Sequence, residues 1–415
     1  MKTVQNTSRI PMSLVTLMIG GVVVGMTEFM MMGVLPDVSQ SLNISIPEAG
    51  HLISIYALGV VVGAPLTAGL AGHFPPKKML MGLMGMFLLF NALFALAPGY
   101  PLLLITRFCA GLPHGAFFGM GAVVASRLAE PGREARAISL MFAGLTLANI
   151  LGVPLGTWVA QQFGWRLSFG VIALIAGVAI LSIQKWMPVI TAAPKMALKE
   201  SLKIFTRSDV WLIIGISSIG TGGLFAWISY IAPMMIEVTG FDPASITGIM
   251  IVAGLGMAVG NFIGGRLADK YSPLKTTAML LLTMVVSLLI VKWVAPFKIA
   301  AIVMTFITGA VAFAVIAPMQ MLMINTAKGA EMLASSTIQA SANTGNALGA
   351  YLGGLPIAAG FGYAAPQLVG AGLAFTGVIF CIALFLISQP GSGKETINIK
   401  SLQLLKKWSG ALFNR

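Results

Sequence analysis

The sequence predicts an all-α membrane protein whose twelve transmembrane helices form two pseudo-symmetric six-helix halves. Of its 415 residues, 57% are apolar and only 9% are charged, whereas a soluble domain carries about 25% charged residues. The apolar residues stand in long runs, and a helix needs about 20 of them to cross a hydrocarbon core about 30 Å thick. The second half of the chain also repeats motifs of the first. This composition excludes a water-soluble fold.

Apolar runs bounded by charged residues, Pro or Gly define the twelve predicted spans. The first six cover residues 12–35, 49–72, 79–97, 102–126, 137–160 and 167–184. The second six cover residues 210–236, 244–265, 276–294, 299–325, 334–357 and 367–388.

The basic residues predict the orientation in the membrane. If the N-terminus is cytoplasmic, the inner segments hold 21 of the 25 Lys and Arg residues, and the outer loops hold only Arg166, Lys292 and Lys298. The remaining one, Arg107, lies within a span. Because Lys and Arg concentrate on the cytoplasmic side, we expect both termini in the cytoplasm. The net charge of +13 is thus mainly an orientation signal, and we expect no nucleic-acid partner.

The domain organisation follows from these spans. We expect an N-terminal half (1–184), a basic cytoplasmic linker (185–209), a C-terminal half (210–388) and a cytoplasmic tail (389–415). Apolar residues share one helical face in the linker and another in the tail, which indicates helices lying on the inner leaflet. A solvated basic loop is the alternative. The residues concerned are Leu198, Leu202 and Phe205, and then Leu402, Leu405, Trp408 and Leu412.

The internal repeat has an offset of about 197 to 200 residues. The N-x-x-G-x-x-x-G pattern that begins at Asn149 recurs at Asn346, and the loop 68–74 recurs as 265–271. Parallel repeated halves around an axis along the membrane normal are the plan of transporters with a binding site near the bilayer midplane.

Several motifs resemble those of the major facilitator superfamily. Residues 265–270 (Gly-Arg-Leu-Ala-Asp-Lys) resemble its G-x-L-a-D-R loop signature, and Arg107-x-x-x-Gly111 resembles its fourth-helix signature. Residues 152–156 resemble the fifth-helix signature of its drug:proton antiporter branch. Five further segments are similar to arabinose-efflux-type permeases, and they are 27–29, 56–59, 113–118, 164–166 and 225–230. The resemblance implies the major facilitator fold and proton-coupled export.

The loop signature departs from the family pattern in the first half of the chain. Gly72 replaces the expected Asp, His73 the Arg, and Pro75 the Gly. A charge-relay gate resembling that of the family is therefore expected only around Asp269, with Arg266 and Lys275 as partners.

Glu28 and Arg107 are the charged residues that orientation does not explain. Both lie roughly 10 Å below the outer surface at 1.5 Å per residue, so they can meet in one cavity. A lone ionisable group at that depth costs several kcal/mol unless it is paired, hydrated or protonated. Glu28 is therefore our candidate proton carrier. The alternative is a permanent Glu28–Arg107 ion pair that locks the N-terminal half.

Uncharged polar and aromatic residues are the candidate substrate ligands. Hydroxyls and carboxamides donate and accept hydrogen bonds without charge, which suits sugar hydroxyl groups. The alternatives are interfacial anchors for the aromatic residues, a packed histidine, and interhelical hydrogen bonds for the carboxamides. The candidates are Tyr56, His114, Asn149, Trp227, Tyr230, Gln339, Asn343 and Asn346.

These observations predict a secondary active transporter that exports a small solute, such as a sugar or related hydroxylated compound, by proton antiport. Export of amphipathic drugs is the alternative, favoured by 26 Met residues and the aromatic content. A membrane-embedded enzyme is disfavoured because there are only three His and one deep carboxylate. We expect no metal, no cofactor and no ATP site, and a monomer in a bacterial inner membrane.

Overall fold

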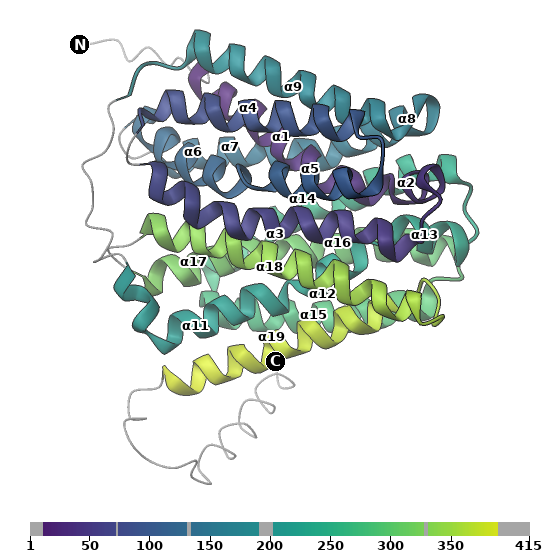
Figure 1. Ribbon diagram of the computed structural model, residues 1–415. Helices are drawn as coiled ribbons and strands as arrows, with labels where there is room; N and C mark the ends of the chain where they lie inside the picture. Colours follow the sequence, from purple (N-terminus) through teal and green to yellow (C-terminus); the bar gives the residue numbers. More distant parts are fainter. Residues whose placement is uncertain (1–10, 72–73, 131–133, 191–201, 328–330, 389–415) are drawn as a thin grey trace, which may run out of the picture.

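The computed structural model describes residues 11–71, 74–130, 134–190, 202–327 and 331–388, and the fold of these residues is helical (Figure 1). The first set of helices comprises α1 (Met12–Gly33), α2 (Leu35–Leu42), α3 (Ile46–Ala71), α4 (Pro76–Leu96), α5 (Tyr100–Gly111), α6 (His114–Leu128), α7 (Glu134–Leu147), η1 (Ala148–Gly152), α8 (Val153–Phe163) and α9 (Trp165–Trp186). The second set comprises η2 (Leu202–Thr206), α11 (Ser208–Gly215), η3 (Ile216–Gly220), α12 (Gly222–Ile228), α13 (Ile231–Glu237), η4 (Pro243–Ser245), α14 (Ile246–Lys270), α15 (Pro273–Val294), α16 (Lys298–Ala314), α17 (Ile316–Thr326), α18 (Glu331–Ala358) and α19 (Pro366–Ile387).

The membrane-length segments match the hydropathy prediction closely. Within the described residues, eleven helical segments are long and apolar enough to cross a membrane, and each coincides with a predicted span. The predicted span 334–357 falls on α18, which has 28 residues but is not one of the eleven. Its carboxamides and hydroxyls, such as Gln339 and Asn343, lower its mean hydropathy. The predicted helices of the linker and the tail lie largely or wholly outside the described residues, and the described end of the linker is the short 3₁₀ helix η2.

Four of the spans are interrupted, which hydropathy did not predict. Pro113 separates α5 from α6, because proline has no N–H to donate to the preceding turn. The π-helical turns η1 and η3 interrupt the spans 137–160 and 210–236, and the second of these spans is broken again at Tyr230. Val315 separates α16 from α17. Such π turns are frequent at functional sites.

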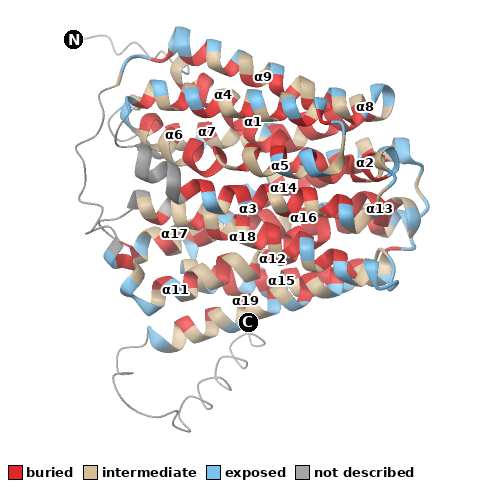
Figure 2. Ribbon diagram, viewed as in Figure 1, coloured by how far each residue is buried: buried red, intermediate tan, exposed pale blue. Residues whose placement is uncertain are grey.

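The two sets of helices lie side by side (Figure 1). Most of the first set lies in the upper part of the view and most of the second in the lower part, and they meet where α3 packs against α18 and η1 against α14. The terminal face, on the left, is the face at which α1 begins and α19 ends. The opposite face carries α2 and α13. Buried residues concentrate between the helices, whereas outward-facing apolar residues such as Leu174 and Ile299 are exposed (Figure 2), as expected for a surface in contact with lipid.

Close helix packing repeats in the two sets at the offset of the internal repeat. Gly59 and Gly63 on α3 face backbone oxygens at the end of α5, and Gly256 and Gly260 on α14 face backbone oxygens of α16. Small residues four apart let helix backbones approach closely in membranes. The repeat is therefore visible in the packing as well as in the motifs.

This packing predicts the effect of one added methyl group. A Cβ atom at position 260 would collide with the backbone oxygen of Ala310, whereas a Cβ at position 248 of the same helix would have no heavy atom within 4 Å. Overpacking costs about 1 to 3 kcal/mol. Gly260→Ala should therefore lower the melting temperature in detergent, measured with a dye that reacts with the buried thiol of Cys381 on unfolding. Gly248→Ala is the matched control, and equal melting of the two variants would contradict the prediction.

Candidate functional site

Glu28 lies where the two sets of helices meet. Its side chain is only 5% exposed, and its Oε1 atom accepts a hydrogen bond of 3.1 Å from Nδ2 of Asn346 on α18. The two residues are 318 positions apart in the chain. The candidate proton carrier therefore takes part in a direct bond between the two sets of helices.

Glycines bring α1 close enough to its neighbours to place Glu28 there. Gly25, nearly one turn before Glu28, faces Leu145 and Ala148 so closely that a Cβ would clash with both. Gly144 on α7 faces the backbone oxygen of Met18 in the same way. The stretch of α1 that carries Glu28 is therefore held against α7 and η1 by small residues.

Arg107 lies beside Glu28 but is not bonded to it. The guanidinium is fully buried and donates to two backbone oxygens, from Nη1 to Thr27 at 2.8 Å and from Nε to Leu52 at 3.2 Å. Its Cζ atom lies 4.5 Å from the ring centroid of Tyr56. Among the described residues no ion pair joins Arg107 to a carboxylate, and its Nη2 atom has no partner. Arg107 thus ties α1, α3 and α5 together and leaves Glu28 available to other partners.

Tyr56 and His114 form a buried pair next to Arg107. The Tyr56 hydroxyl and the His114 Nδ1 atom are 3.0 Å apart, and both side chains are buried. Arg107 stacks on Tyr56, so the three side chains form one contiguous buried cluster. His114 is the packed, hydrogen-bonded histidine that the sequence left as an alternative.

The predicted carboxamides fall into two groups. Asn149 and Asn343 donate to backbone oxygens of their own helical segments, at Leu145 and Gln339 respectively. These bonds do not join two helices. Asn346 bonds the other set of helices at Glu28, and Gln339, the fourth predicted carboxamide, is half-buried on α18. Within the described part of the chain, the Oδ1 atoms of Asn343 and Asn346 are buried without a hydrogen-bond partner.

Trp227 and Tyr230, the predicted aromatic ligands of the seventh span, are fully buried. The Tyr230 hydroxyl donates to the backbone oxygen of Ala350 at 2.6 Å, and it lies so close to Gly50 and Gly354 that a Cβ at either position would clash with it. Tyr230 is therefore wedged between α3 and α18. The Trp227 Nε1 atom has no partner among the described residues, so this indole donor is open to a ligand or a water molecule.

Two features of the site escaped the sequence reasoning. Asn91 on α4 is buried and donates to the Thr27 hydroxyl at 3.2 Å; a lone carboxamide in an apolar span was the signal for it. Phe29 has its ring centroid 6.5 Å from that of Phe225 and 6.1 Å from that of Phe313. These phenylalanines join α1 to α12 and α16, and nothing in their spacing distinguishes them from other apolar residues.

The two sets of helices touch on both sides of Glu28. Toward the opposite face, Gln161 Nε2 donates to the backbone oxygen of Pro243 at 2.6 Å, and the Thr247 hydroxyl donates to Gln161 Oε1 at 3.3 Å. Toward the terminal face, Gly119 on α6 lies close to the Ser336 hydroxyl on α18. Glu28 is therefore enclosed in this structure.

The predicted gating motif lies at the terminal face. Arg266 is exposed, and its guanidinium lies 4.1 Å from the ring centroid of Phe262. Lys275 is exposed, and its backbone N–H donates to the Ser272 hydroxyl, which caps α15. The side chain of Asp269 lies outside the described ones, as do Gly72 and His73. The structure therefore shows no contact for the central residue of this motif.

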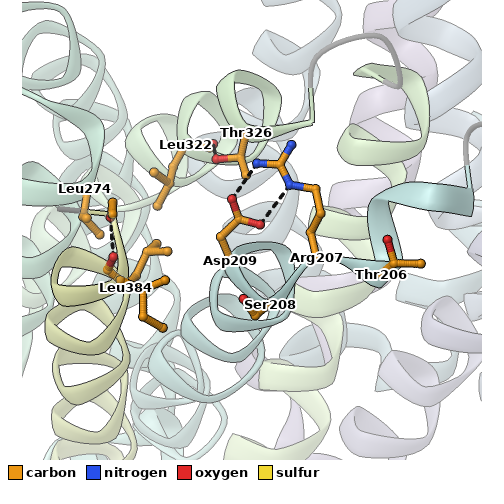
Figure 3. A pocket seen from close by; sticks show the side chains of 10 residues that line it. Thr206, Arg207, Ser208, Asp209, Leu274, Leu322, Thr326 and Leu384 are labelled. Atoms are coloured by element: carbon orange, nitrogen blue, oxygen red, sulfur yellow. Dashed lines mark hydrogen bonds and ion pairs between the residues drawn. The ribbon is translucent and has the colours of Figure 1, made fainter. Parts of the chain in front are cut away.

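A cavity of about 560 Å³ also lies at the terminal face (Figure 3), and Glu28 is not among the residues that line it. It is bounded by the start of α11 and α15 and by the ends of α17 and α19. Arg207 and Asp209 form a bidentate ion pair at its edge, with the shorter contact 2.6 Å. Exposed pairs of this kind contribute little, about 0 to 1 kcal/mol. None of the predicted site residues lines this cavity, and the described residues contain no cluster that could hold a metal ion.

Membrane-length helices in two similar sets, with a buried carboxylate bonded across them, define a membrane transporter. The chain belongs to the Major Facilitator Superfamily, whose family model matches residues 17–332 and 228–415. The family and the relatives are transporters, so the chain is not an enzyme. This confirms the resemblance drawn from the loop and helix motifs.

Individual relatives cover nearly the whole chain. AraJ of Escherichia coli (strain K12) is 40% identical over 362 residues, which are 87% of this chain and 92% of AraJ. A chloramphenicol resistance protein of Streptomyces lividans is 28% identical over 348 residues, 82% of this chain and 87% of the relative. The crystal structure of a D-xylose-proton symporter has a TM-score of 0.71 at 14% sequence identity and covers 92% of this chain and 99% of its own. That likeness shows the fold.

Proposed function

We propose that the protein is a proton antiporter that exports a small hydroxylated solute by alternating access. The observation that carries the proposal is the Glu28–Asn346 hydrogen bond. A buried carboxylate needs a partner, water or a proton, and a partner on the opposite set of helices is lost whenever the two sets separate. The state of Glu28 is then coupled to the conformation of the protein.

The moving units are residues 1–184 and 210–388, joined by the linker 185–209. Opening toward the opposite face breaks the contacts of Gln161 with Pro243 and Thr247 and releases Tyr230 from Gly50. Opening toward the terminal face separates α6 from α18 near Ser336. The enclosed arrangement described above is the intermediate between these two openings.

A sugar or related compound is the first substrate class. The unpartnered Oδ1 atoms of Asn343 and Asn346 accept hydrogen bonds, and the unpartnered Trp227 Nε1 atom donates one. Solute hydroxyl groups act as donors and as acceptors, so they satisfy both kinds of atom. The indole ring also offers an apolar face for stacking.

Export of amphipathic drugs is the second candidate. Phe29, the residue after Glu28, has its ring next to those of Phe225 and Phe313, and we propose that an aromatic cation would bind these rings and the carboxylate together. One relative is named a chloramphenicol resistance protein, which agrees with this class. The three phenylalanine rings favour an aromatic drug, whereas the unpartnered polar atoms favour a sugar.

For the setting of the protein we propose a monomer in a bacterial inner membrane, and the distribution of Lys and Arg favours both termini in the cytoplasm. Its partners are the solute, protons and the lipid bilayer. In this orientation the terminal face is cytoplasmic, and it holds the gating motif of Arg266, Asp269 and Lys275.

Reconstituted liposomes test the function. An imposed pH gradient should drive uptake of one class among labelled pentoses, hexoses and cationic dyes, and a protonophore should abolish the uptake. Uptake of dyes alone would select the drug antiporter. Counterflow that never responds to the gradient would instead show a facilitator and contradict the proposal.

A further inference from the structure

The Glu28–Asn346 bond leaves one buried acceptor without a donor. Asn346 uses Nδ2 to donate to Glu28 Oε1 at 3.1 Å. Its Oδ1 atom is buried and has no hydrogen-bond partner among the described residues. A buried acceptor without a partner is unfavourable because it has lost its hydrogen bonds to water and has formed none in the protein.

Protonation of Glu28 supplies the missing donor. An ionised carboxyl group only accepts hydrogen bonds, whereas a protonated one carries an O–H. Rotation about the terminal bonds of the two side chains brings that O–H to Asn346 Oδ1 while Nδ2 continues to donate to the other carboxyl oxygen. The acid and the amide then form a cyclic pair with two hydrogen bonds, and no buried atom of Asn346 remains unpartnered.

We infer that Asn346 couples the protonation of Glu28 to the closure of the two halves. The acid–amide pair of the protonated acid has two hydrogen bonds and holds the halves together more strongly than the single bond of the ionised acid. The inference rests on the proposed function of Glu28 as the proton carrier. Asn346 acts as a positioning residue here, and its earlier assignment as a substrate ligand becomes secondary.

This pairing explains why the carrier exchanges a proton for a solute molecule and does not return empty. The protonated carrier closes through the acid–amide pair and can pass between its two openings without solute. The ionised, empty carrier has one bond and one orphaned acceptor, so it closes poorly. A solute hydroxyl that donates to Asn346 Oδ1 restores closure, and the carrier then crosses with solute instead of a proton.

Among the polar groups around Glu28, Asn346 is the one whose position relative to Glu28 depends on the conformation. The charged and titratable groups around it are Arg107 on α5, Tyr56 on α3 and, behind Tyr56, His114 on α6. All belong to the N-terminal half and move with α1. Arg107 donates to backbone oxygens of α1 and α3, so its position does not change when the halves separate. Asn346 is the polar partner that does.

The distance between the halves tests the inference without any solute. Spin labels at Gln162 and Ala244, both exposed at the opposite face, report closure after Cys109 and Cys381 are replaced by alanine. Electron–electron double resonance gives the ratio of closed to open molecules at pH 5 and at pH 9. We expect this ratio to be greater at pH 5 by about tenfold, the effect of gaining one buried hydrogen bond.

Four variants show which residues cause the change in the closed-to-open ratio between pH 5 and pH 9. Glu28→Gln carries an amide that pairs with Asn346 through two hydrogen bonds, so it should be closed at both pH values. Asn346→Leu has a similar volume and cannot pair, so the pH response should disappear; Asn346→Gln keeps the carboxamide and should retain part of it. Ser341→Ala is the matched control, because it removes a buried polar group that bonds only its own helix, at the backbone oxygen of Thr337, and it should respond like the wild type.

The outcomes separate the two claims. If the wild type shows no pH response, or Glu28→Gln keeps it, Glu28 is not the proton carrier and the proposed function fails with the inference. If Glu28→Gln is insensitive to pH but Asn346→Leu responds like the wild type, the proposed function stands and the role of Asn346 is wrong. Retention of the Asn346→Leu fold is checked by its elution as a single peak in size-exclusion chromatography, and Asn346→Gln tests the same role if it does not fold.

Discussion

Replacing Glu28 with glutamine should abolish solute uptake driven by an imposed pH gradient, down to the level of liposomes without protein. Glutamine has nearly the same shape and can still bond Asn346, but it cannot bind or release a proton. Counterflow, which needs no proton, should remain detectable. Labelled-solute uptake in proteoliposomes with and without the gradient measures both quantities.

Asp37→Asn is the matched control for this prediction. Asp37 is a partly buried carboxylate on α2, the next helix along the chain, where burial raises its pKa, and it lies outside the bonded site. Its removal should leave gradient-driven uptake near the wild-type level. Gradient-driven uptake by Glu28→Gln would show that the proton passes through another group.

Replacing Arg107 with alanine should reduce both transport and stability. The variant removes the donors to the backbone oxygens of Thr27 and Leu52 and leaves a cavity beside the Tyr56 ring. An orphaned buried acceptor costs about 1 to 3 kcal/mol. The melting temperature in detergent and the rate of counterflow measure the two effects.

Arg107→Lys separates charge from shape at this position. Lysine keeps the positive charge beside Glu28 but lacks the planar fork that reaches two acceptors, so it should recover only part of the stability. Arg166→Lys, which alters a guanidinium over Trp165 near the opposite face, is the control. Wild-type melting and counterflow in Arg107→Ala would mean that the ties of Arg107 to α1 and α3 are dispensable.

The fold could be predicted because its determinants are local. Each apolar run is long enough to span a bilayer on its own, and the repeat of Asn149 as Asn346 needs only comparison of the chain with itself. The interruptions could not be predicted in the same way. The π turns at 148–152 and 216–220 depend on packing against neighbouring helices, as the close approach of Gly254 to the backbone of Asn149 illustrates.

The candidate site was predicted in part. Depth along the helices predicted that Glu28 and Arg107 could meet, since the rise per residue is fixed, and Arg107 bonds the backbone of Thr27 beside Glu28. The partner of Glu28 was not predictable, because depth does not specify which helix faces which. Arg107 was the expected partner on charge alone, yet its guanidinium bonds backbone oxygens, and the carboxamide of Asn346 comes from the other half of the chain.

Simultaneous recording of solute and proton movement tests proton antiport most directly. Liposomes that contain the protein and a pH-sensitive dye receive an inward gradient of the solute identified by the uptake screen, with no initial pH difference. The antiporter should make the interior more alkaline as solute enters, and Glu28→Gln should show no such change. An interior that becomes more acidic, as in symport, or that keeps its pH while solute enters, would contradict the account.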